Sequence, residues 1–90
     1  MEEIIIKEFS YEIKDPIGIH ARPAGLLVRE AGKYSSEITI IKDGKEADAK
    51  KLFGVMGLAV KQDDKITLRI EGEDEETAYE NLEKFFKENL

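Results

Sequence analysis

Residues 66–71 read Ile-Thr-Leu-Arg-Ile-Glu, and their pattern indicates the class of fold. Ile66, Leu68 and Ile70 alternate with polar residues, so the pattern predicts a strand with one apolar side and one polar side. Residues 4–13 begin with three isoleucines and continue with the same alternation, which predicts a second strand of this kind. Strands with a single apolar side form a sheet that is buried on one face and wet on the other.

The segments between these two strands supply further strands and the helices that would cover the buried face. Leu27, Ala31 and Tyr34 are spaced as one stripe of a helix over residues 21–34. The next segments, in chain order, predict a strand near 38–40, a hairpin turn at Asp43-Gly44, a strand near 46–49 and a short helix over 51–56.

A last helix begins near Asp74, whose carboxylate suits an N-cap. The apolar stripe of this helix contains Ala78, Leu82, Phe85 and Phe86. The element order is therefore βαββαβα. We predict an α+β fold, an open-faced β-sandwich in which a four-stranded antiparallel sheet is covered on one face by three helices, in a single domain of residues 1–90.

The composition excludes several classes of site. The 90 residues contain no cysteine and one histidine, which excludes disulfides, thiol catalysis, zinc–thiolate sites and multi-histidine metal sites. No apolar run approaches the roughly 20 residues of a membrane span, and the chain starts Met-Glu-Glu rather than with a basic signal segment. We therefore expect a cytoplasmic protein that needs no metal and no cofactor and does not insert into a membrane.

The net charge of −6 is unevenly distributed along the chain. Residues 71–90 hold eight of the 20 acidic residues and two of the 14 basic residues, so the rest of the chain is balanced. Basic residues predominate over 20–33 and 50–61, which predicts a locally positive face suited to acidic protein partners. For Lys33 and Lys61, ordinary solvated surface lysines are the plain alternative. The acidic total argues against a nucleic-acid partner.

The single histidine, His20, lies between a turn that contains Gly18 and the helix that begins at Ala21. The first N–H groups of a helix have no internal partner and carry the positive end of its dipole, so they bind anions. An anion beside His20 would also meet the guanidinium of Arg22. The positive helix end favours the neutral, nucleophilic form of the imidazole ring, which can accept and release a phosphoryl group. A surface histidine without chemical importance is the plain alternative.

Residues 18–24, Gly-Ile-His-Ala-Arg-Pro-Ala, decide between these two interpretations, because they resemble the active-site signature of the HPr family. That family consists of histidine-containing phosphocarriers of the bacterial phosphoenolpyruvate-dependent sugar phosphotransferase system. Residues 49–58 resemble the second helix of the family and its surroundings, and residues 71–75 resemble the entry into its last helix. Three collinear segments extend the resemblance over essentially the whole chain.

The resemblance implies a role for each residue of the signature. His20 would be phosphorylated on Nδ1 by phospho-enzyme I and would pass the group to a histidine of a sugar-specific enzyme IIA. Arg22 would neutralise the phosphoryl charge, the N–H groups of Ala21 and Arg22 would hold the phosphate, and Gly18 would allow a close approach of the turn. Such a protein is a relay rather than an enzyme. We expect a monomer, because a carrier must present one face to successive partners.

Leu52, Phe53 and Met56 do not fall on one narrow stripe of the short helix. They either pack inward or remain exposed as an apolar docking surface. The resemblance favours the second interpretation, since the corresponding helix contacts enzyme I and enzyme IIA. The same resemblance places contacts on the first helix, at Gly25, Leu26 and Arg29. Val55 is expected in the core.

The chain departs from the family pattern at two positions. Many members from low-GC Gram-positive bacteria carry a regulatory serine directly before the Leu52 equivalent, where this chain has Lys51, so serine-based regulation is not expected. Many members also carry a small polar residue three positions before the histidine, where this chain has Ile17. These differences leave open an alternative function, an HPr-like regulatory binding module that acts outside sugar uptake. A generic interaction domain is a third possibility.

Overall fold

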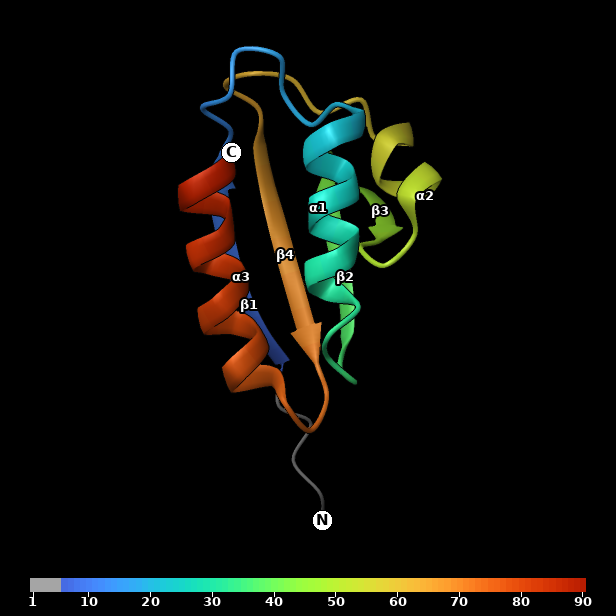
Figure 1. Cartoon of the computed structure of the whole chain (residues 1–90), viewed down its shortest axis with the longest axis vertical. Coiled ribbons are helices and arrows are strands. Elements are labelled where there is room, and N and C mark those ends of the chain that lie inside the picture. The colour runs from blue at the N-terminus through green and yellow to red at the C-terminus, as the bar shows by residue number, and fades with distance from the viewer. Residues whose placement is uncertain (1–5) are drawn as a thin grey trace.

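The computed structural model describes residues 6–90, which form one antiparallel four-stranded sheet and three helices in the order βαββαβα (Figure 1). The sheet order is β1-β4-β2-β3. The strands are β1 (Ile6–Glu12), β2 (Glu37–Lys42), β3 (Lys45–Asp48) and β4 (Lys65–Glu71), and the helices are α1 (Ala21–Ala31), α2 (Leu52–Gly57) and α3 (Glu75–Asn89). The predicted fold class and element order are confirmed.

The alternation of apolar residues produces continuous rows across the sheet. One row joins Phe9, Leu68, Ile40 and Ala47, each paired with the next across all four strands. Phe9, Leu68 and Ile40 are buried on the side that the helices cover. The predicted alternation is therefore correct, and the isoleucines at positions 4 and 5 lie outside the described residues.

The helices lie over one side of the sheet, with α1 between the other two (Figure 1). α3 packs on β1 through aromatic rings. The ring of Phe86 meets those of Phe9 and Tyr11 edge-on, with 5.7 Å between ring centroids in both pairs. α2 lies beside the N-terminal half of α1, at the β3 edge of the sheet (Figure 1). No helix within residues 6–90 has the length and apolar character needed to cross a membrane.

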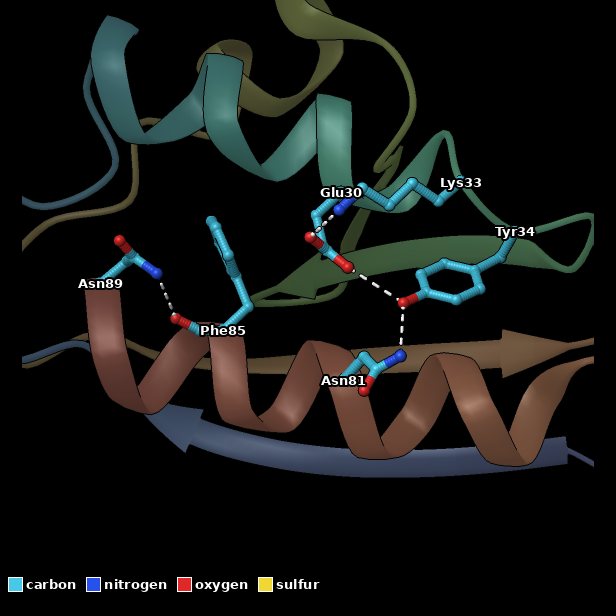
Figure 2. Close-up of polar contacts among 6 residues, drawn as sticks. All are labelled: Glu30, Lys33, Tyr34, Asn81, Phe85 and Asn89. Atoms are coloured by element: carbon cyan, nitrogen blue, oxygen red, sulfur yellow. Dashed lines mark hydrogen bonds and ion pairs between the residues drawn. The ribbon is translucent and has the colours of Figure 1, made fainter.

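The first helix is shorter than the sequence predicts. α1 ends at Ala31 and Gly32 is its C-cap, so Tyr34 lies beyond the helix although it occupies a helical stripe position. The Tyr34 hydroxyl donates to Glu30 Oε2 at 2.9 Å and accepts from Asn81 Nδ2 of α3 at 2.8 Å (Figure 2). Burial raises the pKa of the Tyr34 phenol. Tyr34 thus links α1 to α3, a contact between distant segments that overrides the helical pattern.

The last helix begins where expected, with Asp74 at its N-cap as predicted. Asp74 occupies the N-cap position and its side chain makes no cap hydrogen bond. Its carboxylate instead accepts from the N–H groups of Ser35 and Ser36 at 2.9 and 3.0 Å, and from the Ser36 hydroxyl. The segment that enters β2 brings these donors to the carboxylate, which serves as a tie between elements.

Candidate functional site

A tight turn precedes His20 and aims the chain into α1. Ile17 N donates to Asp15 Oδ1 at 2.8 Å, and Gly18 N donates to Asp15 O at 3.0 Å. Gly18 has φ +80°, in the left-handed region that favours glycine. The turn is therefore built from local hydrogen bonds together with one backbone conformation that a side chain disfavours.

The same turn lies against the 58–64 loop, the segment that joins α2 to β4. A Cβ atom on Gly18 would lie 2.3 Å from Val60 O and 2.7 Å from Lys61 Cα, so only glycine fits. Next to it, Ile19 is buried and its N–H donates to Val60 O at 3.0 Å. The close approach predicted for Gly18 is thus an approach to another part of the chain.

His20 is the N-cap residue of α1, with extended backbone angles of φ −95° and ψ −173°. Its carbonyl accepts from Ala24 N at 2.9 Å, while its side chain makes no cap hydrogen bond. Among residues 6–90, no backbone hydrogen bond uses the N–H groups of Ala21 or Arg22. Two donors and a half-buried imidazole therefore share the positive end of α1, an arrangement that can hold an anion.

His20 and Arg22 line one hollow of about 310 Å³. The other residues that line it are Asp15, Pro23, Leu26 and Asn89. Asn89 belongs to α3, where its amide donates to Phe85 O at 3.0 Å (Figure 2). The Asp-Pro-x-Gly turn signal points to Asp15, but nothing in the local sequence indicates that Asn89 reaches this hollow.

The predicted docking residues are exposed on two adjacent helices. Phe53 is 85% exposed, and Leu26, Leu52 and Met56 are each at least 36% exposed, whereas Val55 is fully buried. We refer to Leu26, Leu52, Phe53 and Met56 as the apolar patch. Gly25 and Arg29 are also exposed on α1. Inward packing is therefore excluded for Phe53.

Two of the lysines that the sequence assigns to the positive face are bound to other groups of the chain. Lys33 pairs with Glu30 at 3.0 Å, and Lys50 Nζ donates to Tyr34 O at 2.7 Å. Within residues 6–90, Arg22 and Arg29 have no salt bridge. Arg22 lines the same hollow as His20, and Lys51 and Lys61 of the 50–61 segment likewise have no salt bridge within these residues.

Comparison with known proteins agrees with this geometry. The family model described as "PTS HPr component phosphorylation site" matches residues 7–88. The chain belongs to the HPr family. It is 47% identical to the phosphocarrier protein HPr of Lysinibacillus sphaericus over 77 residues, which cover 86% of this chain and 88% of the relative.

Solved structures of HPr proteins share the fold. The HPr-C-His structure from Thermoanaerobacter tengcongensis has a TM-score of 0.86 and 44% identity, covering 90% of this chain and 91% of that one. Crh from Bacillus subtilis, an HPr-like protein connected by its description with catabolite repression, has a TM-score of 0.74 and 40% identity, covering 89% and 92%. That Crh structure is described as a domain-swapped dimer, so at least one relative of this chain forms a dimer.

Proposed function

We propose that this HPr-family chain relays a phosphoryl group from phospho-enzyme I to sugar-specific enzyme IIA proteins through a phosphohistidine at His20. The observation that carries the proposal is the meeting of His20 and Arg22 in one hollow at the positive end of α1. Such a site supplies a nucleophile, an N–H cradle and a guanidinium, which are the parts that phosphoryl transfer requires.

In the first transfer, the lone pair of His20 Nδ1 attacks the phosphorus of the donor's phosphohistidine. A new N–P bond forms as the donor's N–P bond breaks; the donor ring, which carries a proton on its other nitrogen, leaves as neutral imidazole, and phosphorylated His20 keeps its proton on Nε2. The transition state spreads negative charge over three oxygens, which Arg22 and the N–H groups of Ala21 and Arg22 stabilise. Gly18 contributes by fixing the turn that places His20. In the second transfer, phosphorylated His20 is the donor and a histidine of enzyme IIA is the acceptor.

Incubation with phosphoenolpyruvate and enzyme I tests the proposal. We expect a mass gain of one phosphoryl group that is acid-labile and absent from His20→Ala. The chain has one histidine, so any phosphohistidine must be at His20. Arg22→Gln serves as a second variant, because it keeps the acceptor but slows its phosphorylation by removing the guanidinium. A wild-type chain that gains no phosphoryl group would refute the relay.

A regulatory binding module is the second candidate. Two residues favour it: Ile17 beside the site is 69% exposed and has no polar group for a phosphate, and Lys51 replaces a serine at the start of α2. The likeness to Crh points the same way. A panel of enzyme IIA proteins separates the two candidates, since discharge to none of them would favour the regulatory module.

We further propose that the apolar patch contacts enzyme I and enzyme IIA, together with Gly25 and Arg29. The exposure of Phe53 and the position of α2 beside the N-terminal half of α1 support this assignment (Figure 1). A monomer suits a carrier that must present one face to two partners in turn. Sedimentation velocity before and after phosphorylation tests that expectation, and a stable dimer in both states would contradict it.

A further inference from the structure

Lys42, the last residue of β2, extends its ammonium group into the 58–64 loop. Its Nζ donates to Leu58 O at 3.3 Å and to Ala59 O at 3.0 Å, and pairs with Asp64 Oδ2 at 3.1 Å. The Lys42 side chain is 18% exposed. One largely buried cation therefore has three partners in a single loop.

The properties of these three partners show what a positive charge stabilises in the loop. Leu58 is the C-cap of α2, so its carbonyl lies at the negative end of that helix. Ala59 has φ +51°, a left-handed conformation that costs energy for any residue except glycine. The Asp64 carboxylate also accepts from Lys61 N at 2.8 Å. The Lys61 N–H, and after it Lys42, lowers the pKa of the Asp64 carboxyl.

This loop is the surface on which the turn before His20 is built. Val60 follows Ala59 directly, and its carbonyl accepts the N–H of Ile19 and fills the space where a Gly18 side chain would lie. A change in the path of the loop at Ala59 therefore moves the carbonyl on which Ile19 depends. His20 is the next residue after Ile19.

We propose that Lys42 is a positioning residue for His20, because its ammonium holds the 58–64 loop in the conformation that places the imidazole at the end of α1. Lys42 itself touches neither the hollow nor the transferred group. The role rests on the proposed phosphoryl relay for its effect on rate, but its effect on the loop is independent of that function.

Amide exchange tests the structural step without any partner. In Lys42→Met the N–H of Ile19 should exchange about tenfold faster or more relative to global unfolding, because the loop carrying Val60 O loosens. Lys42→Arg keeps a cation and should restore most of the protection. Lys45→Met removes a lysine from the same hairpin, exposed and without a salt bridge within residues 6–90, and should leave Ile19 unchanged.

Phosphorylation by enzyme I tests the functional step. Misplacement of a reacting group slows its reaction, so Lys42→Met should lower kcat by about 5- to 100-fold with a smaller change in KM. Asp64→Asn loses the ion pair and should fall between Lys42→Met and the wild type, which provides a second variant should Lys42→Met fold poorly. Ile70→Val weakens the core at the end of β4 that lies away from the 58–64 loop, and it should keep the wild-type kcat.

The outcomes separate the two proposals. Unchanged Ile19 exchange and unchanged kcat in Lys42→Met would overturn the positioning role. Equal losses of kcat in Lys42→Met and Ile70→Val would assign the effect to stability and also overturn it. A wild-type protein that enzyme I does not phosphorylate would refute the relay, while the exchange experiment would still decide whether Lys42 holds the turn.

Discussion

At Gly18, two structural demands exclude a side chain. The backbone has φ +80°, and a Cβ atom would meet Val60 O at 2.3 Å. Gly44 in the β2–β3 turn has the same φ of +80° but nothing within 4 Å of its Cβ position. Alanine substitutions at the two glycines therefore separate the free-energy cost of the left-handed conformation from the cost of the contact with Val60 O.

We predict that Gly18→Ala lowers the free energy of unfolding by about 2–5 kcal/mol, from left-handed strain together with overpacking. Gly44→Ala should cost only the strain, about 1–2 kcal/mol. Urea unfolding of both variants measures the difference. Equal losses would show that the approach of Gly18 to the 58–64 loop contributes nothing to stability.

Local sequence predicts some residues of the site and cannot predict others. His20 and Arg22 are two positions apart at the start of one helix, so their meeting follows from the local pattern. Asn89 and Lys42 reach the site or its supporting loop only through the packing of distant elements. A contact of that kind leaves no periodic or turn signal in the sequence, because neither residue is special in its own segment.

Between elements, the tie from Asp74 to Ser35 and Ser36 connects the start of α3 to the entry of β2. The Ser36 hydroxyl, followed by the Ser35 N–H, lowers the pKa of the Asp74 carboxyl. A carboxyl with a lowered pKa stabilises the fold fully above its ordinary pKa of about 3.9, and this stabilisation is lost as the pH falls below that value.

We predict that Asp74→Asn is less stable than the wild type at neutral pH and that its urea midpoint falls less on acidification below about pH 4. The amide cannot accept as strongly from Ser36, and it does not titrate. Asp43→Asn, in the exposed hairpin turn, should keep the acid sensitivity of the wild type. Parallel acid curves for Asp74→Asn and the wild type would contradict this role of the tie.

The extents of the elements show where periodicity is insufficient. β1, β2 and β4 follow the alternation because one face of the sheet is buried under the helices, whereas the edge strand β3 has no buried residue. The end of α1 does not follow the helical stripe, since Gly32 ends the helix and the Tyr34 hydroxyl bonds to α3. Asp74 occupies the N-cap position that the sequence predicts, but its carboxylate binds donors from another element.

Across the whole molecule, charge and apolar surface are separated. The acidic excess lies in residues 71–90, most of which form α3, whereas the apolar patch lies on α1 and α2. α3 and α2 lie on opposite sides of α1 (Figure 1). An acidic partner would be repelled by α3, so this distribution favours an approach from the α2 side.

We predict that Phe53→Glu raises the Kd for enzyme I by about tenfold or more, because it removes a large exposed anchor and adds repulsion. Its melting temperature should change little, since Phe53 is 85% exposed. Ile6→Glu introduces the same charged residue at an exposed apolar position of β1 and should leave the Kd unchanged. Calorimetric titration that gives equal affinities for Phe53→Glu and the wild type would exclude the patch as a contact.

The face of the sheet that no described helix covers has a practical consequence. Glu8 is exposed on this face, and the chain contains no cysteine. Glu8→Cys would therefore give a protein with one thiol, to which a fluorophore or a solid support can be attached at a single known point. Tethered in this way, the molecule would present His20, α1 and α2 to the solution. Its encounters with partners could then be followed one molecule at a time.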